Sequence, residues 1–167
     1  MRYRNRDRNA IPRALLTSTA GALCSRVKSR DVLDRAAAFH GHLGPWLALG
    51  LKAGLYARRV VSRNPFCLKA VVHCPGRTPY TCFVDGVQVG SGCTLGKGNI
   101  RHIRAARGTW VEFTEKDTPG AGLKLELRPE VWTELHLTPA PNEAAVIRLG
   151  RTFYARPLSR LFIETRA

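Results

Sequence analysis

The sequence lacks a long apolar run, a closely spaced pair of cysteines, an internal repeat and a low-complexity tract. Its most apolar segment, residues 46–61, carries Lys52 in the middle and two arginines near the end, so it predicts no membrane-spanning helix. The five cysteines are odd in number and form no Cys-x-x-Cys pair, which argues against a disulfide framework and a zinc ribbon. We therefore expect a soluble protein in the reducing cytoplasm, with no membrane partner.

Acidic residues are scarce, because 12 Asp and Glu face 27 Lys and Arg and leave a net charge of +15. Residues 1–30 hold eight basic residues and one acidic residue, which is +7 of this excess, and they show little helical or strand periodicity. The pattern predicts a disordered basic arm over 1–30 and one domain over 31–167. The arm could bind a nucleic acid, could target the chain, or could be a wrongly assigned start.

The domain begins with two predicted helices. The first has Ser29 as its N-cap and Asp31 in its first turn, repeats apolar side chains at helical spacing from Val32 to His40, and ends at Gly41. Pro45 is well placed to start the second, which ends near Val61. The small residues of the second helix form one stripe, which consists of Gly50, Ala53, Gly54 and Ala57. Such a stripe lets another backbone approach closely, so we expect this helix in the centre of the core or at a subunit contact.

The remainder reads mainly as strands. The four predicted strands are Leu68–Val72, Ile100–Ala105, Trp110–Phe113 and Leu123–Leu127. Short helices are expected over Thr81–Gly90 and Asn142–Tyr154, and a last strand after Pro157. Together these elements predict an α+β fold, with helices packed on a mainly antiparallel sheet.

The first motif with chemical potential reads Phe-His-Gly-His-Leu-Gly-Pro over residues 39–45. Because Gly41 breaks the helix, His40 and His42 can turn toward one point ahead of the next helix. Two imidazoles in that position could hold a metal ion or move protons. The alternative is that His40 only caps its own helix and that His42 is exposed.

The second motif covers residues 81–99. As a helix, its first half would carry Cys82, Asp85 and Gln88 on one polar face. The loop that follows has four glycines within nine residues, so its N–H groups could converge on an anion, with Lys97 as a nearby positive charge. A P-loop is excluded, because that motif needs Gly at position 91 and Ser or Thr at position 98.

Two cysteines of this segment could join the histidines. As thiolates, Cys82 and Cys93 would complete with His40 and His42 a mixed nitrogen and sulfur set that suits zinc. The alternative is that both cysteines are buried small hydrophobic residues.

Taken together, the two motifs resemble those of the FmdE family, which takes its name from formylmethanofuran dehydrogenase, from about Ala36 to Ile100. The resemblance implies an α+β core, often dimeric, a link to one-carbon or redox metabolism, and a metal site that is usually taken as zinc. It assigns metal ligation to His40, His42, Cys82 and Cys93. Many members read His-Leu-Cys-Pro where this chain has Gly44, so the chain lacks one thiolate and resembles a His-Leu-Gly-Pro subgroup.

We expect a metal-binding protein with a site between the histidines and the glycine-rich loop. The predicted catalytic residues are His42, Asp85, Cys93 and Lys97. The predicted ligand-binding residues are Gln88, Thr94, Gly96 and Asn99. In an enzyme, His42 would act as acid or base, Cys93 as ligand or nucleophile, and Lys97 would hold a carboxylate or oxyanion.

Expected partners are a second copy of the chain in a homodimer and a small anionic metabolite. Two alternatives remain open. The first is a non-catalytic accessory subunit of an oxidoreductase. The second is a nucleic-acid-binding protein that acts through residues 1–30, although no reader motif accompanies that charge.

Overall fold

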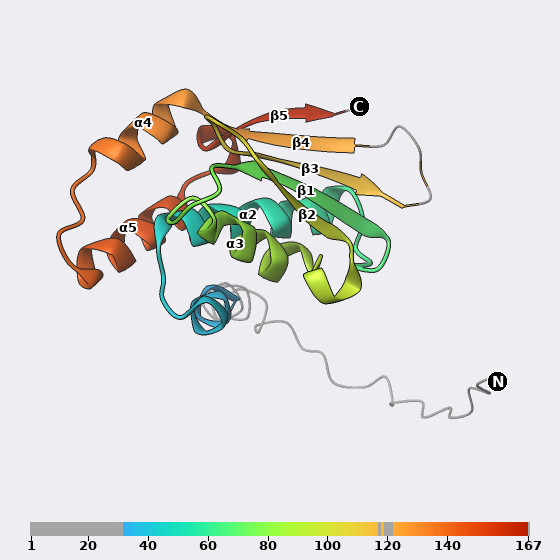
Figure 1. The fold of residues 1–167 in the computed structure, drawn as a ribbon, viewed down its shortest axis with the longest axis horizontal. Coiled ribbons are helices and arrows are strands. Elements are labelled where there is room, and N and C mark those ends of the chain that lie inside the picture. The colour runs from blue at the N-terminus through green and yellow to red at the C-terminus, as the bar shows by residue number, and fades with distance from the viewer. Residues whose placement is uncertain (1–31, 117, 119–121, 167) are drawn as a thin grey trace, which may run out of the picture.

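The computed structural model describes residues 32–116, 118 and 122–166. The predicted basic arm over residues 1–30 lies outside them. In the described part of the chain, helices cover one face of a five-stranded sheet (Figure 1). None of the helices described there is long and apolar enough to cross a membrane.

The elements follow one another as the sequence predicts, with one further α-helix and two short helical turns. The helices are residues 32–40, α2 (Pro45–Val60), α3 (Cys82–Ser91), α4 (Pro129–Leu137) and α5 (Glu143–Ala155). The strands are β1 (Leu68–Cys74), β2 (Ile100–Arg104), β3 (Trp110–Glu115), β4 (Gly122–Leu127) and β5 (Phe162–Arg166). Two short helical turns are η1 (Leu95–Lys97) and η2 (Leu158–Arg160). The predicted α+β fold is confirmed, and α4 is the helix that the sequence pattern did not predict.

The strand order in the sheet is β2-β1-β3-β4-β5. The pairs β1–β3, β3–β4 and β4–β5 are antiparallel, and β1–β2 is parallel. Parallel neighbours need a crossover connection, and α3 with the loop after it supplies this connection. As a result, the first residue of α3 lies near the end of β1, and the loop after α3 returns to the start of β1.

Helix α2 lies in the middle of the described fold. One side of α2 packs together with α3 against the sheet, through buried residues such as Leu49, Phe83 and Val72. Its other side packs against the helix over 32–40, through Leu47 and Leu51 among others. Figure 1 shows this helix on the side of α2 and α3 that faces away from the sheet. The prediction of a helix central to the core is confirmed.

Glycines allow α2 and α3 to pack in direct backbone contact. Gly50 and Gly54 of α2 face Gly86 and Gly90 of α3, and each pair is spaced by four residues. A Cβ on Gly86 would lie 2.6 Å from the amide nitrogen of Leu51 and would overlap a carbonyl oxygen of α2. Carbon atoms in normal contact are about 3.5–4.0 Å apart. We call this packing the α2–α3 glycine contact.

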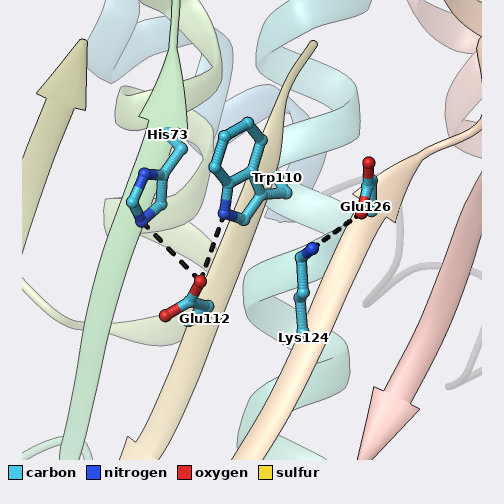
Figure 2. A network of polar contacts seen from close by, with 5 residues as sticks. All are labelled: His73, Trp110, Glu112, Lys124 and Glu126. Carbon is cyan, nitrogen blue, oxygen red and sulfur yellow. Dashed lines mark hydrogen bonds and ion pairs between the residues drawn. The ribbon is translucent and has the colours of Figure 1, made fainter. Parts of the chain in front are cut away.

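The face of the sheet that points away from the helices carries a polar and aromatic network (Figure 2). The ring of His73 stacks on Trp110 with centroids 4.4 Å apart, and Trp110 Nε1 donates to Glu112 Oε1 at 3.2 Å. Lys124 lies over the Trp110 ring and pairs with Glu126 at 2.7 Å. The residues of this network bond to one another across β1, β3 and β4, and they lie on the opposite face of the sheet from the candidate site.

The α2–α3 glycine contact predicts a sign for one substitution. Gly86→Ala should lower the free energy of unfolding by roughly 1–3 kcal/mol, because an overpacked interior costs about that much. Helix propensity alone would raise the free energy of unfolding by up to about 1 kcal/mol, which is the opposite sign. Urea denaturation followed by circular dichroism measures the difference.

Gly96→Ala is the matched control, since an added Cβ there meets no atom within 4 Å. It should leave the free energy of unfolding nearly unchanged. A Gly86→Ala protein as stable as the parent would contradict the backbone contact.

Candidate functional site

The His-Gly-His sequence forms a tight turn between the helix over 32–40 and α2. Gly41 has a positive φ of 96°, and its N–H donates to the carbonyl oxygen of Ala37 at 2.8 Å, so it ends the helix as predicted. The ring centroids of His40 and His42 lie 4.8 Å apart. His42 is exposed, whereas only 11% of the His40 side chain is exposed. The turn therefore brings the two imidazoles side by side.

A carboxylate on α3 holds the more buried histidine. His40 Nδ1 lies 2.7 Å from Asp85 Oδ2. Because an ionised carboxylate only accepts hydrogen bonds, Nδ1 carries the proton and donates it. The other ring nitrogen, Nε2, is buried and has no hydrogen-bond partner in the described part of the chain. An imidazole oriented in this way through Nδ1 is the usual form of a metal-ligating histidine, which binds the ion through the other ring nitrogen.

Asp85 and Gln88 lie together on α3, as the helical spacing predicts. Gln88 Nε2 donates to Asp85 Oδ1 at 3.3 Å, and Gln88 Oε1 accepts from the backbone N–H of Leu95 at 3.2 Å. A row of hydrogen bonds thus runs from His40 along α3 to the glycine-rich loop. Gln88 uses both ends of its amide to connect that loop to the helix.

The glycine-rich loop, residues 92–98, satisfies its own backbone. Hydrogen bonds within the loop or to its neighbours already use the N–H groups of Gly92, Cys93, Thr94, Leu95, Lys97 and Gly98. These amides do not converge on an open anion site, which departs from the sequence expectation. The nest geometry requires free N–H groups that point at one ligand.

The predicted ligand-binding side chains of the loop hold it in place. Thr94 caps η1, and Asn99 Oδ1 accepts from the Thr94 N–H at 2.9 Å. Asn99 Nδ2 donates to the carbonyl oxygens of Pro65 and Leu68, both at 2.8 Å. Gly96 is exposed.

Lys97 turns back on its own loop, because its ammonium donates to the carbonyl oxygen of Gly92 and lies over the ring of Phe66 at 5.1 Å. The predicted oxyanion-holding role of Lys97 stays a prediction.

The two predicted thiolate ligands lie at opposite ends of α3. Cys82 begins the helix, and Cys93 follows its end, where the Cys93 thiol donates to the carbonyl oxygen of Leu68 at 3.3 Å. Helix α3 has 10 residues, and at the helical rise its two ends lie roughly 14 Å apart. One ion cannot bind both thiols, because zinc–sulfur bonds are about 2.3 Å long.

The sequence-based set of His40, His42, Cys82 and Cys93 is therefore not assembled in the structure. Among the described residues, no group of three His, Cys, Asp or Glu side chains is arranged to hold an ion.

Burial raises the pKa of three thiols. It raises the pKa of the Cys93 thiol, although the Ser91 hydroxyl and the charges of Lys97 and Arg58 act in the opposite direction. Burial and then the charge of Asp85 raise the pKa of Cys82. Burial and the nearby Cys82 raise the pKa of Cys74 to about 11. Because the thiolate is the nucleophile, a raised pKa disfavours the nucleophilic role of Cys93, which stays a prediction.

A cavity of about 180 Å³ opens beside the histidine turn. Its lining includes His42, Gly44 and Trp46 near the start of α2, and Cys82 at the start of α3. The opposite wall comes from the α4–α5 region and includes Leu135, Val146 and Leu149. The sequence pattern did not predict this wall because it did not predict α4, although Pro129 followed by Glu130 is a helix-start signal.

Aromatic contacts fix α4 as one wall of the cavity. Tyr80 stacks on Trp132 with centroids 5.2 Å apart, and Trp46 meets both rings edge-on. His136 Nδ1 lies 2.6 Å from the carbonyl oxygen of Trp132, so Nδ1 is the donor there, and His136 Nε2 accepts from the Tyr80 hydroxyl at 2.8 Å. These contacts tie α4 to the start of α2, next to the histidine turn.

The fold and the site define an α+β domain with a carboxylate-oriented histidine beside a small cavity. A family model described as "FmdE, Molybdenum formylmethanofuran dehydrogenase operon" matches residues 39–162, which include the histidine turn and all residues that line the cavity. The chain belongs to this family, as the resemblance of its two motifs implied.

The chain is also similar to a protein of Archaeoglobus fulgidus named "Probable S-adenosyl-L-methionine-binding protein". The two are 30% identical over 100 residues, which cover 56% of this chain and 26% of the archaeal protein. The chain thus spans about a quarter of that relative's length. The homodimer, the bound metal and the oxidoreductase partner stay predictions.

The state of the thiols can be tested by alkylation. In the native protein at about pH 8, iodoacetamide should modify the partly exposed Cys67 before Cys74, Cys82 and Cys93, because burial and a raised pKa leave little accessible thiolate at those three. Mass spectrometry of peptides gives the order. A urea-unfolded sample, in which all four should react, is the control. Rapid modification of native Cys93 would support the nucleophile that the sequence suggested.

Proposed function

We propose that this chain binds a divalent metal ion of the zinc type at the histidine turn, with His40 Nε2 and His42 as its side-chain ligands. One observation carries the proposal, namely the buried Nε2 of His40, which has no partner in the described structure while Asp85 holds Nδ1. The proposed setting is cytoplasmic one-carbon or redox metabolism, in keeping with the name of the family.

A partner for His40 Nε2 would lower the free energy of the folded protein. A buried polar atom without a hydrogen bond costs about 1–3 kcal/mol. A metal ion at Nε2 would offset that cost, and His42 is close enough to share the ion, with its ring centroid 4.8 Å from that of His40. The carboxylate of Asp85 would fix the orientation of the His40 ring.

Two imidazoles leave coordination positions open. Because no third donor is arranged beside them in the described residues, water or a ligand in the adjoining cavity would fill those positions. A metal ion there would act as a Lewis acid toward a bound oxygen atom. The residues of the chain would position that ligand, through the imidazole of His42 and the walls of the cavity.

Glycine at position 44 limits the strength of the site. A Cβ on Gly44 would lie 3.3 Å from His42 Nε2, so a cysteine at this position would have its sulfur close to the His42 imidazole. In this chain that donor is absent. We therefore expect weaker binding than at a closed structural zinc site, which has four protein ligands.

We do not extend S-adenosyl-L-methionine binding from the archaeal relative to this chain. The match covers only 26% of that protein. Pockets for molecules of that size are roughly 300 Å³ or larger, whereas the cavity beside His42 has about 180 Å³. A nucleic-acid role would rest on residues 1–30, which lie outside the described residues.

Metal content and affinity test the proposal. Untagged protein should bind close to one equivalent of Zn²⁺ by elemental analysis and calorimetry, and His40→Ala and His42→Ala should each abolish this binding. Asp85→Asn should weaken it roughly 10- to 100-fold, because an outer partner of a metal-ligating histidine has an effect of that size.

Three controls sharpen the test. His102→Ala and Cys93→Ala should retain zinc, since neither side chain lies with the histidine pair in this geometry. Gly44→Cys should bind zinc more tightly than Gly44→Ala, which adds the same Cβ without a thiol. Absence of zinc from the parent protein, or loss of zinc in Cys93→Ala with retention in His40→Ala, would refute the site.

A further inference from the structure

The cavity beside the histidine turn has the composition of a pocket for a small, mainly apolar molecule. Its apolar lining residues include Pro45, Trp46, Leu47, Leu135, Val146 and Leu149. His42, Cys82 and Thr138 are its polar exceptions, and no lining residue is acidic. Pockets for small ligands share this pattern of an apolar wall with a few polar groups that orient the ligand.

Gly44 connects the apolar wall to the imidazole. A Cβ at this position would lie 3.3 Å from His42 Nε2 and 3.6 Å from Val146 Cγ1, so it would occupy the space between them. Because residue 44 is glycine, that space stays open. A molecule in the cavity can therefore contact His42 and the apolar wall at the same time.

The size and charge of the pocket restrict what it can bind. An apolar cavity of about 150 Å³ holds benzene, and this cavity has about 180 Å³. The wall offers no carboxylate to pair with a cationic ligand. Helix α2 begins at the cavity with no side-chain cap and no acidic residue in its first turn, so its positive end favours a negative head group.

We propose that this cavity binds a small carboxylate with an apolar body of about the size of benzene. The carboxylate lies beside His42, and the apolar body packs against Trp46, Val146 and Leu149. This proposal rests on the proposed function in one respect. If a metal ion is bound at the histidine turn, the carboxylate would also fill its open coordination positions. The apolar part of the pocket does not depend on the metal.

Benzoate is the probe, and benzamide is its uncharged counterpart of similar shape. Calorimetric titration of the full chain, with Zn²⁺ and again with EDTA, should show binding of benzoate in both conditions, more tightly with Zn²⁺. Benzamide should bind roughly tenfold more weakly than benzoate, because a hydrogen bond to a charged group is roughly twice as strong as one to a neutral group. Equal binding of the two probes would overturn the assignment of a carboxylate.

Val146→Phe fills the cavity and should weaken benzoate binding by at least roughly tenfold, while zinc binding stays unchanged. Ala144→Phe is the matched control, because Ala144 is exposed on the same helix and does not line the cavity. It should bind benzoate like the parent protein. No benzoate binding by the parent, or unchanged binding by a folded Val146→Phe protein, would refute the pocket.

The two proposals fail separately. If benzoate binds in EDTA and zinc does not bind at all, the pocket stands and the metal site is refuted. If zinc binds and benzoate binds in neither condition, the metal site stands and the pocket is refuted. A circular dichroism spectrum of each variant establishes that it is folded.

Discussion

The candidate site depends on the backbone contact between α2 and α3. Helix α2 follows the histidine turn directly, and α3 carries the carboxylate that holds His40, so the packing of one helix on the other sets the 2.7 Å distance between His40 and Asp85. Two facing pairs of glycines, including Gly50 and Gly86, let the backbones touch. A shift of one helical turn is about 5.4 Å, which would separate the imidazole from its carboxylate.

Helix α3 separates the two ends of the second sequence motif, which have different roles. At its beginning, Cys82 and Asp85 lie near the histidine turn and the cavity. At its end, Cys93 and Asn99 bond to the start of β1 and fix the crossover between two parallel strands. The length of α3 keeps these ends apart, so the potential for metal and ligand binding lies at one end and the structural support lies at the other.

Local signals predicted much of the fold, because Gly41 and Pro45 act on the backbone next to them. Helix α4 has a local start signal in Pro129 and Glu130 but no apolar stripe, since only Val131 among its residues is buried and contacts with distant aromatic rings hold the helix. The pairing of imidazoles followed from spacing alone, whereas its carboxylate partner needed the packing of α3. Spacing also could not show that side chains such as Asn99 already satisfy the glycine-rich loop.

The central claim is that Asp85 holds His40 with Nδ1 protonated and leaves the Nε2 lone pair free for a ligand. Long-range ¹H–¹⁵N NMR of histidine-labelled protein measures this directly, before and after addition of Zn²⁺. We expect the Nδ1-protonated tautomer of His40 in the zinc-free protein and a large change of the Nε2 signal on addition of zinc. A His40 ring protonated on Nε2, or signals of both histidines that do not respond to zinc, would contradict it.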